Sequence, residues 1–240
     1  MRVKTIVCLP TYNERSNLEP MLRALGETLP AGGRVLVIDD SSPDGTGELA
    51  ERLARELAYV DVLHRPVKNG LGPAYLAGFR RALADGAELV LEMDCDFSHD
   101  PRDVPRLIEA AERADLVLGS RYVAGGSIPS WGIVRRAISA GGSAYARLLL
   151  GVRVRDLTGG FKCYRRAVLE RIDLQAISSR GYAFQVETTY RALQAGFRVV
   201  EIPITFVDRE LGGSKMSRSI VLEAAWKVPA LRVSALLGRL

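Results

Sequence analysis

Short apolar runs alternate with helical patterns through the first half of the 240-residue chain, and this alternation limits the fold more than any other feature. The runs predict strands at 3–9, 34–38, 60–63, 87–93 and 115–118. Apolar residues three and four apart predict helices between them, at about 15–28, 45–58, 71–85 and 101–113. Such alternation is typical of a mostly parallel, Rossmann-like sheet covered by helices on both faces. The sequence therefore predicts an α/β protein.

The pattern changes after residue 120. A helical stretch is expected between the glycine pairs at 125–126 and 141–142, and a loop entering a helix at 156–169. A helix near 182–195 and a strand near 197–206 follow. With no repeat or linker in view, we expect one domain over 1–217 and a helical extension over 218–240.

Polar clusters follow three of the predicted strands. They are Pro10-Thr11-Tyr12-Asn13-Glu14, Asp39-Asp40-Ser41-Ser42 and Asp94-Cys95-Asp96. The carboxyl ends of parallel strands share one edge of a sheet, and ligands of open α/β sheets bind beyond that edge. We therefore expect the three clusters to lie together in a binding site.

Asp94 and Asp96 are one residue apart. On an extended strand alternate residues point to the same side, so both carboxylates could face one point. Two like charges at one point favour a cation between them, and carboxylates suit hard divalent ions. The alternative is a strand-end turn that caps the next helix; the agreement of three clusters favours the binding site.

The net charge and the cysteine content exclude few classes of function. The net charge of +5 permits binding to phosphates or to an anionic membrane surface without requiring either. No nucleic-acid-binding pattern is present, so no nucleic acid is expected as a partner. Cys8, Cys95 and Cys163 are odd in number and widely spaced, which indicates buried thiols in a reducing compartment.

The longest apolar segment, 219–240, is interrupted by charges and by Pro229. It predicts a helix that packs on the domain or lies at an interface, without a transmembrane span. The expected location is therefore cytoplasmic, either free or peripheral at the cytoplasmic face of a membrane.

Three segments are similar to the nucleotide-sugar half of inverting GT-A glycosyltransferases: LPTYNE at 9–14, VIDDSSPDGT at 37–46 and MDCDFSHDP at 93–101. Five later segments resemble those of the polyprenol (dolichol) phosphate mannose synthases. They are GSRYVAGG at 119–126, SWGIVRR at 130–136, DLTGGFKCYRR at 156–166, GYAFQVE at 181–187 and FVDRELGGSK at 206–215. The resemblance covers about 5–217 and implies a GT-A fold.

The resemblance also implies an activity and a set of site residues. The family transfers mannose from GDP-mannose to a polyprenyl phosphate, with Mg²⁺ or Mn²⁺ as cofactor. By resemblance the guanosine would be held by Pro10, Tyr12, Glu14, Ile38 and Asp40. The metal and donor would meet Asp94, Cys95 and Asp96, the donor diphosphate Arg209 and Lys215, and the acceptor phosphate Arg121, Arg135 and Ser139. A membrane surface is an implied partner, and an integral membrane partner protein is left open.

Two features depart from the family. Some members have a metal-binding Gln where this chain has Ser98, and a hydroxyl is a weaker ligand than an amide carbonyl. Some members also carry membrane-spanning helices after the catalytic domain, which we do not expect here.

The implied chemistry is consistent. A metal at Asp94 and Asp96, with Arg209 and Lys215, would offset the charge that grows on the leaving diphosphate. A phosphate monoester is already mostly a dianion at neutral pH, so the acceptor needs no base and neither histidine is required. Attack from the face opposite the leaving group predicts inversion, from an α-linked donor to a β-linked product.

Several residues also have structural interpretations. Arg135-Arg136 could be a solvated helix face, and one of Asp39 and Asp40 is expected to cap a turn, with Asp40 favoured for the nucleoside. Asp156 and Glu187 are open between structural and active-site roles. His99 is expected to be a loop residue. Tyr164 and the cysteines are expected to pack in the core.

The segment 128–150 mixes apolar side chains with arginines. This composition suits either an interfacial helix near anionic lipids or ordinary core packing, and both remain open.

Three other functions remain open from the sequence. The first is a related synthase that loads glucose or an amino sugar from a UDP donor. The second is a transferase to a saccharide hydroxyl, which would need a catalytic base. The third is a silent nucleotide-sugar-binding subunit of a membrane complex.

Overall fold

The computed structural model describes residues 4–179, 181–208, 218–238 and 240. Its strands are β1 (Thr5–Thr11), β2 (Arg34–Asp39), β3 (Val60–His64), β4 (Leu89–Glu92), β5 (Leu116–Ser120), β6 (Lys162–Arg165) and β7 (Val199–Pro203). Its helices are α1 (Arg15–Thr28), α2 (Thr46–Glu56), α3 (Leu71–Ala84), η1 (Pro101–Asp103), α4 (Val104–Ala110), α5 (Ile133–Leu150), α6 (Arg166–Arg171), α7 (Tyr182–Gln194) and α8 (Arg218–Leu236).

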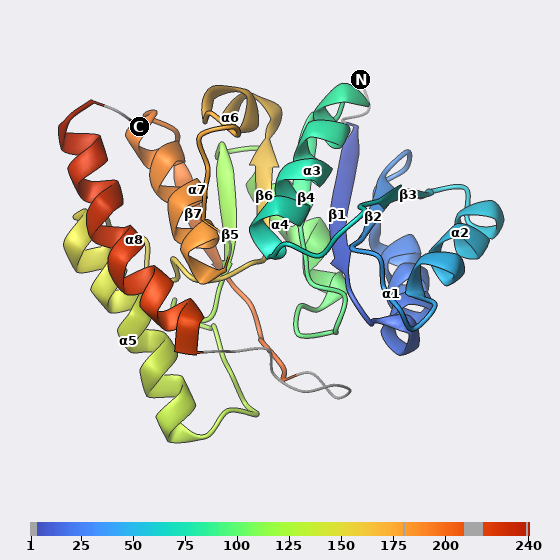
Figure 1. The fold of residues 1–240 in the computed structure, drawn as a ribbon, viewed down its shortest axis with the longest axis horizontal. Helices are drawn as coiled ribbons and strands as arrows, with labels where there is room; N and C mark the ends of the chain where they lie inside the picture. The colour runs from blue at the N-terminus through green and yellow to red at the C-terminus, as the bar shows by residue number, and fades with distance from the viewer. Residues whose placement is uncertain (1–3, 180, 209–217, 239) are drawn as a thin grey trace.

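The seven strands form one sheet in the order β3-β2-β1-β4-β6-β5-β7. All neighbours are parallel except β6, which runs antiparallel to both β4 and β5. The predicted α/β architecture with a mostly parallel sheet is therefore confirmed (Figure 1).

Alternating side chains of the central strands supply two separate cores. On β1, Ile6 and Cys8 point to one face of the sheet, whereas Val7 and Leu9 point to the other, as the two-residue period of a strand requires. The first face is covered by α3, α5, α6, α7 and α8, and the second by α1, α2 and α4. All four β1 side chains are almost completely buried, because the parallel sheet is covered on both faces.

Three elements differ from the prediction. Helix α5 was expected between the glycine pairs at 125–126 and 141–142, but it runs through the second pair and ends at Leu150. Strand β6 lies in the segment that we expected to be a loop entering a helix. Its first residue, Lys162, is completely buried, and a lysine ordinarily indicates an exposed position. The helix expected at 101–113 is divided into the short η1 and α4, and α4 ends at Ala110.

Helix α8 packs on the rest of the protein. It lies beside α5 and contacts α7 (Figure 1). Val228 and Leu231 are buried in the core, and Arg232 donates a hydrogen bond to the carbonyl oxygen of Leu150 (3.2 Å). Among the described helices, none has both the length and the apolarity to cross a membrane. The division into a domain over 1–217 and an extension over 218–240 stays a prediction.

Candidate active site

The three polar clusters follow strands that are neighbours in the sheet. In the register of the parallel ladders Thr11 pairs with Asp39, and Cys8 pairs with Glu92. Strands β2, β1 and β4 therefore end at the same edge, where the clusters at 10–14, 39–42 and 94–96 meet. The structure places them together as the strand order predicts.

Asp39 holds the turn that follows β2. Its Oδ1 accepts hydrogen bonds from the hydroxyls of Ser42 (2.6 Å) and Thr11 (3.3 Å), and its Oδ2 accepts one from the Ser42 N–H (3.2 Å). These contacts use both carboxylate oxygens and tie the turn to the end of β1. Asp39 is thus the turn-capping member of the Asp39-Asp40 pair.

Asp40 instead forms a buried ion pair with Arg65. Arg65 Nη1 lies 2.6 Å from Asp40 Oδ1, and Arg65 Nη2 also donates to Asn69 Oδ1. Burial raises the pKa of Asp40, and the positive charge of Arg65 opposes that rise. Beside them, Lys68 Nζ lies 3.6 Å from the centre of the Tyr12 ring, a cation–π contact. Arg65 and Lys68 are site residues that we did not predict.

The other residues expected to hold the donor differ in what they can offer. The side chains of Ile38 and Cys95 are buried in the two cores, so only their backbone atoms could contact a nucleotide. Burial raises the pKa of the Cys95 thiol well above its usual value. Glu14 is half-buried, and its Oε2 accepts a hydrogen bond from Asn17 Nδ2 (2.9 Å). Pro10 lies on β1 and pairs with Ile38.

Asp94 and Asp96 lie beyond the end of β4, which stops at Glu92. The expectation that they alternate along an extended strand is therefore wrong. The chain bends through this segment, and Phe97 has a positive φ of 59°. Asp94 Oδ1 accepts a hydrogen bond from the Tyr75 hydroxyl (3.3 Å), and Asp96 Oδ1 accepts one from the Ser98 N–H (3.1 Å). The bend, and not the pleat of a strand, sets the direction of these carboxylates.

His99 anchors this bend. Its imidazole is buried, stacks on Phe161 (4.9 Å between ring centres), and accepts a hydrogen bond at Nδ1 from the Asp94 N–H (3.2 Å). Its pKa is lowered to about 4, mainly by burial; the negative charge of Asp96 opposes this shift and the positive charge of Arg121 adds to it. The expectation of a plain loop residue is thus incomplete, because His99 fixes the backbone of Asp94.

The oxygen atoms at this bend suit a divalent cation. Asp94 and Asp96 supply carboxylates, and the Ser98 hydroxyl beside them is buried with no hydrogen-bond partner among the described residues. Such a hydroxyl is costly unless it meets a ligand or water. An all-oxygen set suits Mg²⁺ or Mn²⁺. Within the described parts of the chain, no three His, Cys, Asp or Glu side chains gather as a protein-only metal site. Water or a diphosphate would therefore complete the coordination.

Arg121 is held by Asp156 at the end of β5. Its Nε and Nη2 each lie 2.7 Å from a carboxylate oxygen, and Nη2 also donates to Thr158 Oγ1 (2.9 Å). Asp156 is completely buried, so its role includes a structural one. The guanidinium carbon of Arg121 lies 5.3–5.8 Å from the centres of the Tyr122, Trp131 and Phe206 rings.

Arg135 is more accessible than Arg121. It pairs with Asp208, and its guanidinium carbon lies 4.2 Å from the centre of the Trp131 ring. Ser139, one turn further along α5, accepts a hydrogen bond from the Tyr122 hydroxyl (2.8 Å). Arg136 Nη2 donates hydrogen bonds to the backbone carbonyl oxygens of Ile128 and Trp131, so this side chain is not merely solvated. Arg209 and Lys215 lie outside the described residues.

A buried polar network lies behind the site. Lys162 Nζ lies 3.5 Å from Glu92 Oε1, and it donates to Gln185 Oε1 (2.6 Å) and Thr188 Oγ1 (3.2 Å). Burial raises the pKa of Glu92 to about 7. Tyr164 packs in the core as expected and donates to Thr188.

Glu187 has a structural role. Its Oε1 accepts from Arg191 Nε (3.0 Å) and its Oε2 from the Ser179 hydroxyl (2.5 Å), both within the protein interior. These contacts support the packing interpretation of Glu187.

The segment 128–150 has both buried and exposed apolar side chains, so part of it packs in the core, and an interfacial role for the exposed part stays a prediction. Ile128, Trp131 and Leu150 are buried, whereas Ile133 and Leu148 are 86% and 76% exposed. The outer side of α5 is thus an exposed apolar surface, and Trp226 on the neighbouring α8 is 75% exposed.

Comparison with known proteins agrees with this architecture. Residues 6–173 match the model of the glycosyl transferase family 2. The chain is 52% identical over 228 residues to an undecaprenyl-phosphate mannosyltransferase of Micrococcus luteus, covering 95% of this chain and 93% of the relative. It is 48% identical over 238 residues to a polyprenol monophosphomannose synthase of Mycolicibacterium smegmatis, covering 98% and 89%.

Solved structures share the fold. A glucosyl-3-phosphoglycerate synthase of Mycobacterium tuberculosis, in complex with Mn²⁺ and UDP, superposes with a TM-score of 0.67 at 18% identity, covering 99% of this chain and 80% of that one. A mannosyltransferase of Pyrobaculum calidifontis, in complex with GDP-Man and Mn²⁺, superposes with a TM-score of 0.60 at 16% identity, covering 99% of this chain and 75% of that one. The sequence resemblance and the GT-A fold are confirmed: the chain belongs to glycosyl transferase family 2, with relatives named polyprenol monophosphomannose synthase and undecaprenyl-phosphate mannosyltransferase.

Proposed function

We propose that this protein transfers mannose from GDP-mannose to a polyprenyl phosphate, with inversion at the sugar C1, at the cytoplasmic face of a membrane. The observation that carries the proposal is the position of Asp94 and Asp96. They follow β4, which lies between two other parts of the site in the strand order. On one side are the ends of β1 and β2, with Tyr12 and Asp40, and on the other side is Arg121 at the end of β5. A nucleotide at the first and an acceptor phosphate at the second would meet at these carboxylates. The names of the two relatives support both the sugar and the acceptor.

Asp94 and Asp96, with the Ser98 hydroxyl, would hold Mg²⁺ or Mn²⁺. A bound metal would neutralise charge on the donor diphosphate. The chain's own residues prepare the site for it: His99 fixes the backbone of Asp94, and the Ser98 N–H fixes Asp96. Arg209 and Lys215 are proposed to contact the diphosphate from the other side.

Arg121 and Arg135 are proposed to orient the acceptor phosphate in different ways. Arg121 is rigid, because Asp156 and Thr158 hold its Nε and Nη2. Arg135 is about one third exposed and is held by the surface carboxylate of Asp208 and the Trp131 ring, so it can turn toward a phosphate more easily than the buried Arg121 can. The Arg135 guanidinium would bind phosphate oxygens bidentately, whereas Arg121, whose Nε and Nη2 are engaged by Asp156 and Thr158, would add positive charge beside them. Because the acceptor arrives as an anion, no side chain has to remove a proton.

The membrane surface is the proposed source of the acceptor. The exposed apolar side chains of α5 and α8 offer a region for contact with lipid, and arginines lie among them. This is a peripheral mode of binding, and an integral membrane partner protein would act in addition to it.

The test is product analysis with competing donors. Purified protein in detergent is given a short polyprenyl phosphate with labelled GDP-mannose, UDP-glucose or UDP-N-acetylglucosamine, and the lipid fraction is analysed by NMR for its sugar and anomeric configuration. The proposal predicts a lipid-linked β-mannose from GDP-mannose and little transfer from either UDP-sugar. Preferred transfer from a UDP-sugar would contradict the donor assignment, and an α-linked product would contradict inversion.

A further inference from the structure

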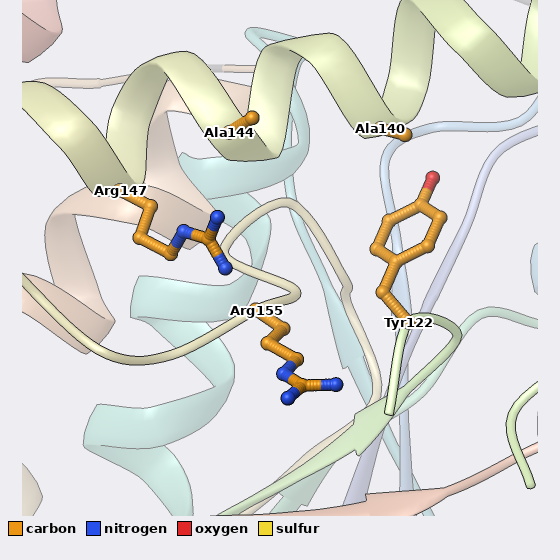
Figure 2. A pocket seen from close by; sticks show the side chains of 5 residues that line it. All are labelled: Tyr122, Ala140, Ala144, Arg147 and Arg155. Carbon is orange, nitrogen blue, oxygen red and sulfur yellow. The ribbon is translucent and has the colours of Figure 1, made fainter. Parts of the chain in front are cut away.

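A hollow of about 280 Å³ lies between α5 and the loop that follows it. Tyr122, Ala140, Ala144, Arg147 and Arg155 line it. Figure 2 shows the guanidinium groups of Arg147 and Arg155 on one side of this hollow and the Tyr122 ring on the other. The alanines lie one helical turn apart, so their short side chains leave the space open on this side of α5.

The two arginines of this hollow lack the ion pairs that hold the other arginines near the site. Arg121 is paired with Asp156 and Arg135 with Asp208, whereas no carboxylate among the described residues pairs with the Arg147 or Arg155 side chain. Glu201, whose carboxylate lies at this loop, uses its two oxygens to accept the backbone N–H groups of Arg155 and Asp156 (2.8 and 2.9 Å).

Two positive charges that face one hollow are stabilised by an anion between them. The planar guanidinium fork matches phosphate oxygens, and it does so better than the point charge of a lysine. The chemistry of the lining therefore favours a phosphate group as the ligand.

The surroundings favour a phosphate that is carried on a lipid. Leu148, next to Arg147, is 76% exposed, and Ile133, seven residues before Ala140 and so on the same side of α5, is 86% exposed. A phosphate in the hollow would thus have apolar surface beside it for hydrocarbon. A soluble phosphate would make no use of this surface.

We propose that Arg147 and Arg155 form a second phosphate-binding site, which takes the phosphate of a membrane lipid next to the acceptor site. Tyr122 connects the two sites, because its ring lines the hollow and its hydroxyl donates to Ser139 (2.8 Å). The inference deepens the proposed function and rests on it for one of two lipid sources. The lipid is either the polyprenyl phosphate, held before or after transfer, or an anionic phospholipid that anchors the protein.

The experiment measures binding of the full chain to phosphatidylcholine vesicles that contain either polyprenyl phosphate or phosphatidylglycerol, with no donor present. The test variant is Arg147→Gln/Arg155→Gln. The control is Arg153→Gln/Arg171→Gln, which removes the same charge from two exposed arginines that do not line the hollow. Circular dichroism and the thermal midpoint check that both variants fold.

We expect the test variant to bind at least one of the two vesicles about tenfold more weakly, with a much smaller loss in the control. A loss confined to polyprenyl phosphate identifies the acceptor or product lipid, and a loss on phosphatidylglycerol identifies a headgroup site. Binding of inorganic phosphate to wild type is measured by titration calorimetry as well, and if it is as tight as binding to either vesicle, the lipid part of the inference is wrong. Equal losses in test and control variants would overturn the site altogether.

Failure of this inference is distinguishable from failure of the proposed function, because binding is measured without transfer. Lipid binding that depends on Arg147 and Arg155, in a protein that transfers no mannose, would support the site and contradict the function. Mannose transfer with unchanged lipid binding and an unchanged acceptor KM in the test variant would support the function and contradict the site.

Discussion

Arg121 and Asp156 form a buried bidentate ion pair in which both nitrogen–oxygen distances are 2.7 Å. The same carboxylate accepts the backbone N–H of Arg121 (2.9 Å), so Asp156 fixes both the side chain and the main chain of Arg121. The segment after β5 is thereby tied to the Gly-rich loop before β6. This contact positions the arginine that is proposed to meet the acceptor.

Replacing Asp156 tests how much stability this pair provides. Asp156→Ala leaves a buried guanidinium without its partner, so the free energy of unfolding should fall by about 3–5 kcal/mol. Urea unfolding followed by circular dichroism measures the change. Glu112→Ala, which removes an exposed carboxylate, is the control and should change it by less than about 0.5 kcal/mol. Equal stability of the two variants would mean that the pair contributes nothing.

The Arg65–Asp40 pair predicts coupling in nucleotide binding. If Asp40 contacts the nucleoside, Arg65 holds it in place, and either alanine variant should weaken GDP binding about tenfold. The double variant should lose less affinity than the sum of the two single losses, with a coupling energy of about 0.5–1.4 kcal/mol. Titration calorimetry measures these affinities, with exposed Arg52→Ala as control. Strictly additive losses would show that the two residues act independently.

His99 predicts a dependence of stability on pH in metal-free protein. Its pKa is about 4 in the folded state and about 6.5 when unfolded, so the unfolded chain binds the proton first as the pH falls. The neutral His99 therefore contributes to the free energy of unfolding above pH 6.5, and this contribution is lost as the pH falls toward 4. Between pH 7.5 and 5 the loss is about 2 kcal/mol.

The measurement compares urea unfolding of wild type and His99→Gln in EDTA at pH 7.5 and 5. Wild type should lose about 2 kcal/mol more than the variant on acidification. His64→Gln, at a histidine whose side chain is 51% exposed, is the control and should follow wild type. Equal losses in wild type and His99→Gln would show that His99 does not titrate in this way.

Two glycines should respond oppositely to alanine. A Cβ on Gly142, in the middle of α5, would meet no atom within 4 Å, so Gly142→Ala should stabilise the protein by about 0.5–1 kcal/mol. A Cβ on Gly126 would lie 2.6 Å from the Ser120 carbonyl oxygen and 2.8 Å from the Arg121 backbone. Gly126→Ala should therefore cost about 1–3 kcal/mol. Thermal unfolding measures both, and a stable Gly126→Ala protein would contradict the close approach.

Much of the fold was predictable because it follows from local patterns. The helix expected at 15–28 has those bounds, and the strands that carry the three polar clusters lie within two residues of their predicted ends. Continuous apolar runs identify such strands because both faces of the sheet are covered. Strand β6 was missed because its buried Lys162 is stabilised by Gln185 and Glu92, partners distant in the sequence.

The site was predictable only in part, for a similar reason. The position of the carboxylates beyond β4 follows from strand order, but their direction depends on the bend that His99 holds. Arg65 reaches Asp40 from the end of β3, and no spacing along the chain indicates that contact. Tertiary pairs of this kind are set by the packed structure.

The most direct measurement of the central claim is transfer of labelled mannose from GDP-mannose to a short polyprenyl phosphate, with Mg²⁺, Mn²⁺ or EDTA. Asp96→Asn is compared with Asp100→Asn, a carboxylate four residues away that caps η1. We expect a metal-dependent lipid product from wild type and from Asp100→Asn, and a loss of at least about a hundredfold in Asp96→Asn. Undiminished transfer in EDTA, or by Asp96→Asn, would contradict this expectation.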